Sequence, residues 1–402
     1  MSSSANATTT AHELRTADRA KVAGLLRTVP GATTVAFIMH PRQDVSHHPL
    51  VPELLARGWA VWTQGSRSQG NDLALLHEQA LLDMAAGQMF LRERGFENVV
   101  CIGHSGGATL AAFYFEQAIQ PSGGRLKQAP GGQPVALADA DMPLPDGLVL
   151  LAPHPGQGVL LERVIDPSVL DEADPLSVDP ELDPWSAMNG FMPPPTSSNY
   201  SQEFVDRYRR GQRDRVAKID AFARERIGVA SNSKAYFAAS NDPQDERASV
   251  ATGVMTVHRT DADLRSVDLS IDPNNRRYGS LFGPRPDLSD FGVAGFGRLA
   301  TPEAWLSTWS SISSNANLAR NLKAVTVPTL IVEFTGDQAC FPADIAAFTA
   351  ACSATDVENV SIAGQHFGAP IHRGETSGTQ LAGSAMSNWM GERFPTGAFV
   401  SM

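Results

Sequence analysis

The sequence predicts an α/β protein in which helices flank a mostly parallel central sheet and a long insertion interrupts the core. Two observations predict this class. Short β-branched runs alternate with helical stretches from about residue 18 to residue 155, and the same alternation returns after residue 322. Between them, residues 156–321 lose this rhythm and contain an Asp-, Pro- and Ser-rich stretch. Parallel strands need crossover helices, so the alternation favours a sheet that is covered on both faces.

The first part of the predicted core alternates strands and helices. The strands are expected at Lys21–Leu26, Thr33–Met39, Trp59–Thr63, Val99–Ile102 and Gly147–Leu151. The helices are expected at Pro49–Arg57, Asp72–Arg94 and Ser105–Gln117. In the second of these helices, four apolar residues share one face at helical spacing: Leu75, Leu82, Ala86 and Met89.

The last part of the chain continues the same pattern. Its expected elements are a strand at Thr329–Phe334, a helix near Ala343–Ala351, a strand at Val357–Ile362 and a helix near Ser377–Arg393. Within the insertion, the pattern predicts a helix over Gln202–Ile227, a hairpin in which Val267, Leu269 and Ile271 alternate with polar residues, and a helix that begins at Thr301-Pro302.

We therefore divide the chain into three parts. Residues 18–155 and 322–402 form the α/β core, and residues 156–321 form an inserted lid or cap. Residues 1–17 are mostly small and polar, and we expect them to be disordered. A long insertion in an α/β chain usually covers the binding crevice, so the cap is expected to contribute to the binding site.

Composition argues against several classes of function. The 43 acidic residues outnumber the 32 basic ones, which argues against a nucleic-acid partner because phosphates bind basic surfaces. No apolar run approaches the ~20 residues of a membrane span, and the N-terminus does not resemble a secretory signal, so we expect a cytoplasmic protein that acts on a small molecule. The three cysteines form no CxxC pair, and no nucleotide or zinc motif occurs; neither a cofactor nor a metal is expected.

The strongest chemical signal is a G-x-S-x-G motif at residues 103–107, centred on Ser105. It lies between a buried apolar strand and a helix of small residues. A serine on such a sharp turn needs small neighbours, because the backbone is strained and the helix passes close to the strand. The turn also brings the N–H groups at the start of the helix beside the serine, where they favour developing negative charge.

These residues resemble the nucleophile elbow of the α/β-hydrolase superfamily, in which the triad follows the chain order Ser, Asp or Glu, His. The segment from Val327 to Asp337 resembles the strand end that carries the acid, and Asp337 matches that residue. The segment from Ile362 to Gly368 resembles the loop that carries the histidine, and His366 matches it. The resemblance covers residues 18–155 and 322–395.

The resemblance implies that Ser105 is the nucleophile, His366 its base and Asp337 the carboxylate that orients the base. His372 is the nearest rival of His366, but it falls beyond the loop after the strand. Some members of the superfamily carry the acid after the preceding strand, which would nominate Glu162 or Asp166 instead.

The oxyanion hole departs from the common His-Gly pattern, because Phe37–Arg42 reads FIMHPR. Pro41 has no N–H to donate, so the expected backbone donors are Gly106 and Arg42. The Arg42 side chain either binds a substrate carboxylate or lies solvated on the rim. Four other residues are candidates to line the pocket, although His104 is also expected to be structural: His40, His104, Trp305 and Trp309.

The expected function is a serine hydrolase that cleaves a carboxylic ester of a bulky apolar or aromatic substrate through an acyl-enzyme at Ser105. A C–C bond hydrolase for aromatic ring-fission products would share the same triad. An amidase, a thioesterase or an acyltransferase is also open, as is a non-catalytic binding protein with this fold.

Overall fold

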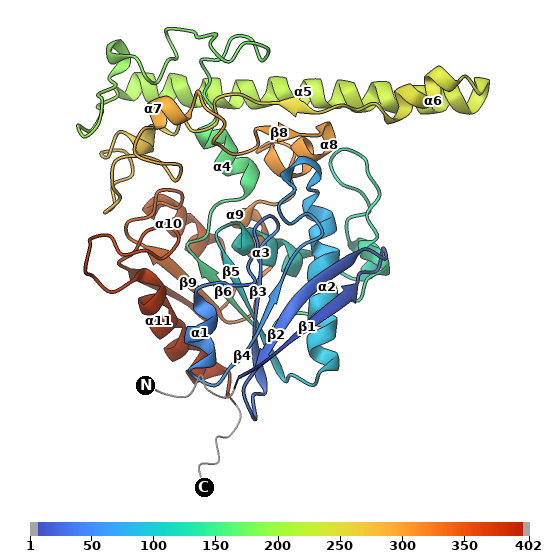
Figure 1. Ribbon diagram of the computed structural model, residues 1–402, viewed down its shortest axis with the longest axis vertical. Coiled ribbons are helices and arrows are strands. Elements are labelled where there is room, and N and C mark those ends of the chain that lie inside the picture. Colours follow the sequence, from blue (N-terminus) through green and yellow to red (C-terminus); the bar gives the residue numbers. More distant parts are fainter. Residues whose placement is uncertain (1–6, 397–402) are drawn as a thin grey trace.

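The computed structural model describes residues 7–396 and has an eight-stranded sheet at its centre (Figure 1). The strand order is β1-β2-β4-β3-β5-β6-β9-β10, and β2 runs antiparallel to both of its neighbours while the other pairs are parallel. The strands are β1 (Thr8–Arg15), β2 (Lys21–Thr28), β3 (Thr34–Met39), β4 (Ala60–Gln64), β5 (Asn98–His104), β6 (Gly147–Leu151), β9 (Thr329–Phe334) and β10 (Val357–Ile362).

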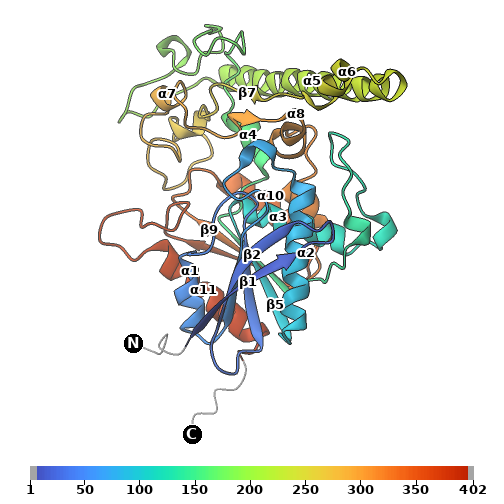
Figure 2. The same cartoon turned by 45° about the vertical axis from the view of Figure 1, so that its right-hand side comes forward.

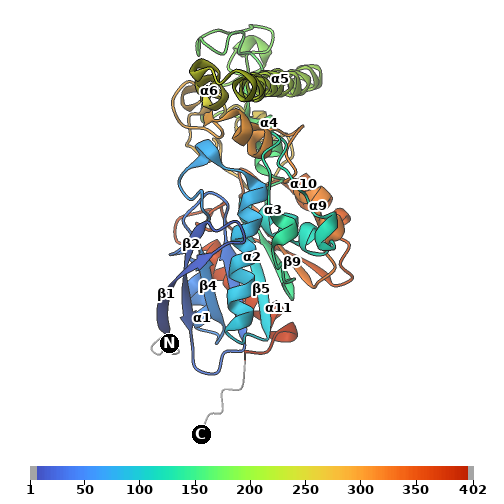
Figure 3. The same ribbon diagram turned by 90° about the vertical axis from the view of Figure 1, so that its right-hand side faces the viewer.

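Two layers of helices cover this sheet (Figure 3). Helices α1 (Leu50–Leu55) and α11 (Gly378–Arg393) pack on one face through a core that includes Leu54 and Met386. The other face carries α2 (His77–Glu93), α3 (Gly106–Ala118), α9 (Leu318–Asn321) and α10 (Pro342–Ala351). Strands β3, β4 and β6 are buried along their whole length, which explains why their sequences are apolar rather than alternating. The predicted core strands and helices are confirmed, with small shifts at their ends.

The prediction of disorder for residues 1–17 was wrong where the structure describes them. Residues Thr8–Arg15 form β1, which pairs antiparallel with β2 over eight residues from Thr8–Thr28 to Arg15–Lys21. This edge strand is mostly exposed, and Leu14 and the ring of His12 are its contacts with the core, so its sequence lacks an apolar pattern. Backbone pairing with β2 orders it instead. Residues 1–6 lie outside the described part of the chain.

The chain between β6 and α9 forms a second layer beyond the carboxyl ends of the parallel strands, and we call residues 156–317 the cap (Figures 1 and 2). Its longest element, α5, lies across the top of the molecule with α6 packed beside its far end. The regular elements of the cap are α4 (Gln157–Val164), α5 (Gln202–Ser240), α6 (Pro243–Val250), β7 (Met255–Thr256), α7 (Pro286–Ser289), β8 (Leu299–Ala300) and α8 (Pro302–Ala304), which continues into a π-helical turn at Trp305–Trp309.

The cap differs from the sequence prediction in two places. Helix α5 continues beyond Ile227 to Ser240 because α6 folds back along it and supports residues that have no apolar periodicity. The predicted hairpin around Val267 is wrong. Side-chain carboxylates accept hydrogen bonds from the local N–H groups instead: Asp263 accepts from Arg265 at 3.0 Å, and Asp268 accepts from Ser270 at 3.0 Å. The predicted helix start at Thr301 is confirmed, since its hydroxyl caps the N–H of Ala304.

A fully buried ionic cluster joins three segments of the cap. The guanidinium of Arg259 pairs with Asp166 and with Asp290, whose Oδ2 lies 3.3 Å from Nε. Asp290 also accepts the N–H of Asp261 at 2.9 Å. Burial, and then the charge of Asp290, raise the pKa of Asp166. Removing one partner from such a cluster leaves an uncompensated buried charge, so these side chains have a structural role in the cap.

The strand order, the antiparallel second strand and the crossover helices on both faces define an α/β-hydrolase fold with a large insertion after β6. Among residues 7–396, no helix is both long enough and apolar enough to cross a membrane.

Candidate active site

Ser105 lies on a sharp turn between β5 and α3, with φ 55° and ψ −120°. A left-handed backbone is costly for a non-glycine residue and is retained only where the surrounding structure holds it. Here the close packing of α3 against β5 and the end of β3 holds it. A Cβ atom on Gly103 would lie 2.4 Å from the Cα of Ala108, and one on Gly107 would lie 2.6 Å from the carbonyl oxygen of Met39. The two outer glycines of the motif are therefore steric requirements of this turn.

The structure brings Ser105, His366 and Asp337 into one hydrogen-bonded chain. His366 Nε2 lies 2.9 Å from Ser105 Oγ, and His366 Nδ1 lies 2.8 and 2.9 Å from the two carboxylate oxygens of Asp337. Asp337 Oδ1 also accepts the N–H groups of Ala339 and Cys340, at 2.7 and 3.0 Å. The carboxylate fixes the proton of His366 on Nδ1, which leaves the Nε2 lone pair directed at the serine hydroxyl.

The chain of three side chains is buried below the cap. The exposed fraction is 7% for Ser105, 3% for His366 and 0% for Asp337. A cap loop contacts the loop that carries the acid, because Asn274 Nδ2 donates to the carbonyl of Asp337 at 2.9 Å. Next to it, the N–H of Asn275 donates to the carbonyl of Thr335 at 2.7 Å.

The alternative triad residues lie elsewhere. Glu162, on α4, accepts a hydrogen bond from Ser311, and Asp166 belongs to the buried Arg259 cluster. His372 is exposed to solvent, beyond the loop that holds His366. Asp337 is therefore the carboxylate that meets His366.

Two further histidines hold the backbone of His366 in place. His104 Nε2 donates to the carbonyl of His366 at 2.9 Å, so His104 Nδ1 is an acceptor and takes the Nε2 proton of His48 at 3.0 Å. The N–H of Leu50 in turn donates to His48 Nδ1 at 3.3 Å. Burial lowers the pKa of His48 to about 4 and that of His104 well below its usual value, so both rings are neutral. His104 is thus a positioning residue, and it also lines a pocket of about 200 Å³ together with Phe367.

The prediction that the backbone N–H of Arg42 is the second oxyanion donor was wrong. After Pro41 the chain turns back over the ring of His40, and the N–H groups of Arg42 and Gln43 both donate to His40 Nδ1, at 3.0 and 2.9 Å. The Arg42 N–H is therefore already engaged. The Gly106 N–H stands at the first position of α3 and has no partner within the helix.

The side chain of Arg42 is neither free nor solvated. Its Nε donates to Asp72 at 2.9 Å, and its guanidinium stacks on Trp309, with 4.8 Å between Cζ and the ring centroid. Trp309 therefore contacts the core at the edge of the site. Trp305 packs inside the cap and donates to Asp220 at 2.7 Å, so it does not line the pocket.

Three buried side chains gather around Gly106: His40, His154 and Gln157. His40 was predicted from the sequence to line the pocket, but Gln157, the first residue of α4, was not. The position of both residues after a strand could have indicated them, because the ends of β3 and β6 lie on either side of the end of β5 in the sheet. Polar residues that follow such strands converge at the carboxyl edge of the sheet.

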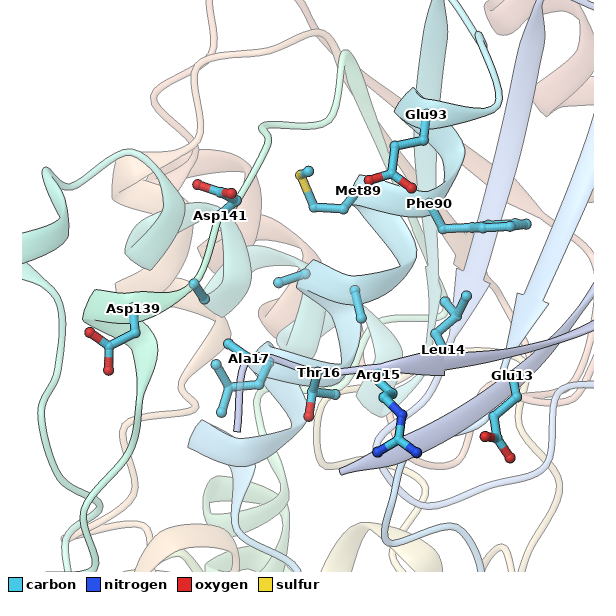
Figure 4. Close-up of a pocket in the computed structure, with 14 residues that line it drawn as sticks. Glu13, Leu14, Arg15, Thr16, Ala17, Met89, Phe90, Glu93, Asp139 and Asp141 are labelled. Atoms are coloured by element: carbon cyan, nitrogen blue, oxygen red, sulfur yellow. The ribbon is translucent and has the colours of Figure 1, made fainter. Parts of the chain in front are cut away.

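A surface pocket of about 480 Å³ lies elsewhere, between the end of β1 and helix α2 (Figure 4). Its polar lining includes four carboxylates, and it contains none of the residues of the Ser105 site. The carboxylates are Glu13, Glu93, Asp139 and Asp141. Across residues 7–396, no group of three or more His, Cys, Asp or Glu side chains is arranged to hold a metal ion.

Comparisons with known proteins give structural likeness alone. No family model matches the chain, and no curated protein matches its sequence. The esterase domain of a Rhodothermus marinus protein is 10% identical, with a TM-score of 0.43 and coverage of 95% of this chain and 98% of that one. Est1E from Butyrivibrio proteoclasticus is 12% identical, with a TM-score of 0.45 and coverage of 95% and 98%. Hypothetical protein PA2218 from Pseudomonas aeruginosa is 12% identical, with a TM-score of 0.48 and coverage of 97% and 94%.

The chain has an α/β-hydrolase fold, and its site contains a hydrogen-bonded Ser-His-Asp arrangement. At these identities the likenesses concern the fold, and they say nothing about the substrate.

Replacing Gly103 by Ala is expected to destabilise the protein by at least about 1–3 kcal/mol, the usual cost of overpacking, because backbone atoms of α3 occupy the position of the new methyl group. Gly391→Ala is the matched control. Gly391 is exposed on α11 with nothing within 4 Å, so the change should stabilise by up to about 1 kcal/mol. Urea unfolding of both variants tests this, and equal stability of Gly103→Ala and wild type would contradict the steric argument.

The free energy of unfolding should fall as the pH drops from about 6.5 to about 4. The pKa of His48 is about 4 in the folded protein and 6.5 ordinarily, so the unfolded chain binds the extra proton in this window. Stability from this group is fully present above pH 6.5 and is lost below it. Urea unfolding at several pH values measures the slope, which should be shallower in His48→Gln. An unchanged slope in that variant would argue against a neutral buried His48.

Proposed function

We propose that this protein is a serine hydrolase that cleaves a carboxylic ester through an acyl-enzyme at Ser105. The observation that carries the proposal is the hydrogen-bonded chain Ser105–His366–Asp337, in which the base meets the nucleophile at 2.9 Å. A serine hydroxyl becomes a useful nucleophile when an adjacent base takes its proton, and the base needs a partner that fixes its tautomer. Both requirements are met by side chains that come from three separate loops.

In the acylation step, Ser105 Oγ attacks the carbonyl carbon of the ester while His366 Nε2 takes the hydroxyl proton. The resulting imidazolium is stabilised by Asp337, and negative charge develops on the former carbonyl oxygen beside the N–H of Gly106. Collapse of this intermediate breaks the bond to the alkoxy oxygen. His366 then gives its proton to that oxygen, and the alcohol leaves.

Deacylation repeats these steps with water. His366 Nε2 takes a proton from the water molecule as its oxygen attacks the acyl carbon, and a second tetrahedral intermediate forms. The bond to Ser105 Oγ breaks, His366 returns the proton to Oγ, and the carboxylic acid leaves.

A bulky apolar or aromatic group on the substrate is supported by Phe367. Its ring centroid lies 4.8 Å from that of His366, and the side chain is 52% exposed. Phe367 therefore offers an apolar surface beside the base, and a substrate that covered it would gain by removing this surface from water.

Ser105→Ala should lower ester turnover by about 10⁶-fold and leave the fold intact, since the residual rate would come from binding and oxyanion stabilisation alone. A fluorophosphonate probe should label the wild type at Ser105 and fail to label the variant, as checked by intact mass and peptide mapping. A panel of aryl esters provides the turnover assay. Labelling without ester turnover would point to C–C hydrolysis or acyl transfer, and unchanged turnover in Ser105→Ala would refute the proposal.

Asp337→Asn should lower kcat by about 10⁴-fold, because an amide no longer fixes the productive tautomer of His366. The matched control is Asp166→Asn, which alters the buried Arg259 cluster of the cap and should change stability without removing the turnover of the folded enzyme. Steady-state kinetics on both variants, with unfolding midpoints measured alongside, distinguish the two carboxylates. A mild effect of Asp337→Asn would exclude Asp337 as the triad acid.

A further inference from the structure

The oxyanion site described above has a single backbone donor, the N–H of Gly106, since the Arg42 N–H is bonded to His40. A tetrahedral intermediate of acyl transfer is usually stabilised by two or more donors aimed at its negative oxygen. Additional donors must therefore come from other groups near Gly106. The candidates are the three buried polar side chains that surround this residue.

The tautomer of His40 is determined by its contacts. Two backbone N–H groups donate to Nδ1, so this nitrogen carries a lone pair and the proton of the neutral ring is on Nε2. The ring is 3% exposed, and burial lowers its pKa well below the usual value. Its two hydrogen bonds are both at Nδ1, and Nε2–H makes none within residues 7–396.

His154 repeats this arrangement from another strand end. The N–H of Gly156 donates to its Nδ1 at 3.1 Å, which again leaves the ring proton on Nε2. This side chain is 4% exposed, and burial lowers its pKa well below the usual value. Within the described residues its Nε2–H is likewise without a hydrogen-bond acceptor. Two neutral imidazoles, on loops after different strands, thus carry unused N–H donors.

Gln157 supplies the third polar group. It is 1% exposed, and neither its amide nitrogen nor its amide oxygen has a hydrogen-bond partner within residues 7–396. Buried amides in folded proteins are nearly always satisfied, so an unsatisfied one indicates a group that is kept for a ligand. The hydroxyl of Thr308 donates its proton to the carbonyl of Leu75. The neighbour of Gln157, His77, therefore donates through Nδ1 to this hydroxyl, at 3.1 Å. His77 Nε2 is therefore an acceptor that faces Gln157; burial lowers the pKa of His77 to about 4, and the contact with the Gln157 side chain acts in the opposite direction and raises it. The amide nitrogen of Gln157 carries two protons, so that one faces this ring while the other is free for Gly106 and its surroundings.

The three groups converge on one point. A Cβ atom on Gly106 would lie 2.5 Å from Gln157 Nε2, 2.8 Å from His154 Nε2 and 2.9 Å from His40 Nε2. Gly106 is thus a glycine for a different reason from Gly103 and Gly107. It leaves room for these nitrogens beside the residue that donates the backbone N–H.

We propose that His40, His154 and Gln157 form a side-chain oxyanion pocket that, together with the Gly106 N–H, binds the carbonyl oxygen of the substrate and stabilises its negative charge. This inference rests on the proposed serine hydrolase function and names further catalytic residues for it. Neutral donors that are already fixed in a buried site need no reorganisation when charge develops, which is the condition under which such donors are most effective.

The first test is Gln157→Leu, which keeps the approximate shape and removes the donor. Loss of a donor that acts in the transition state should lower kcat by about 10²–10³-fold and leave KM nearly unchanged. The control is Gln88→Leu, since Gln88 is a buried glutamine that hydrogen-bonds Cys101 in the core, and its loss should affect stability alone. Unchanged kcat in folded Gln157→Leu would overturn the role of Gln157.

The second test separates the two nitrogens of His40. Asn can reproduce the acceptor at Nδ1 but not the donor at Nε2, whereas Gln can reach the Nε2 position with an N–H. His40→Asn should therefore lower kcat by about 10²-fold or more, and His40→Gln should recover part of the loss. The opposite ranking would assign His40 to holding the loop at Arg42 and would overturn its role as a donor. Substitution of His154 by Asn and by Gln tests in the same way whether His154 is a donor.

A trifluoromethyl ketone matched to the best ester provides an independent readout, because its adduct with Ser105 places a negative oxygen in the same pocket. Its affinity should fall in parallel with kcat/KM across the variants, while the affinity of the product acid should change little. The two proposals fail differently. Absence of probe labelling and ester turnover in the wild type would refute the serine hydrolase itself. Full turnover with normal kcat in the donor variants would refute the side-chain pocket alone.

Discussion

The close approach of helix α3 to strand β5 is the constraint on which the rest of the site depends. It leaves no room for a side chain at Gly103, the end of β3 leaves none at Gly107, and Ser105 is fixed in a left-handed conformation between them. The same turn directs the first N–H of α3 toward the place where negative charge would form. Because β3 and β6 flank β5 in the sheet, the loops that follow them must pass beside this turn, and they bring His40 and His154 with them.

The site is organised by histidines that act in different ways. His366 faces the nucleophile and Asp337, while His104 and His48 form a chain that holds its backbone. Arg42 is held at the edge of the site by Asp72 of the core and by the ring of Trp309 from the cap. The cap supplies the loop at Asn274 that contacts the acid, so the core and the insertion are both needed to bury the triad.

The sequence predicts the core strands well, and it names the three side chains that the structure joins in one hydrogen-bonded chain. Both depend on local signals: apolar runs, a Gly-rich turn, and polar residues that follow strands. It fails where structure depends on pairing with a distant segment. Strand β1 is polar and is ordered by β2, and the last turns of α5 are supported by α6. The prediction of Arg42 as the second oxyanion donor failed for a related reason. A backbone pattern indicates which N–H groups exist, but it does not show that the ring of His40 would capture the one at Arg42.

The hydrogen bonds of the site histidines also determine where a proton can reside. A neutral imidazole has one lone pair, and in His40, His48, His104 and His154 that lone pair already accepts an N–H. Each of these rings would have to break a hydrogen bond before it could take up a proton. His366 is different, since its lone pair faces the hydroxyl of Ser105, which gives up its proton in the proposed reaction. In that reaction the proton stays on His366, because the lone pairs of the neighbouring imidazoles are already occupied.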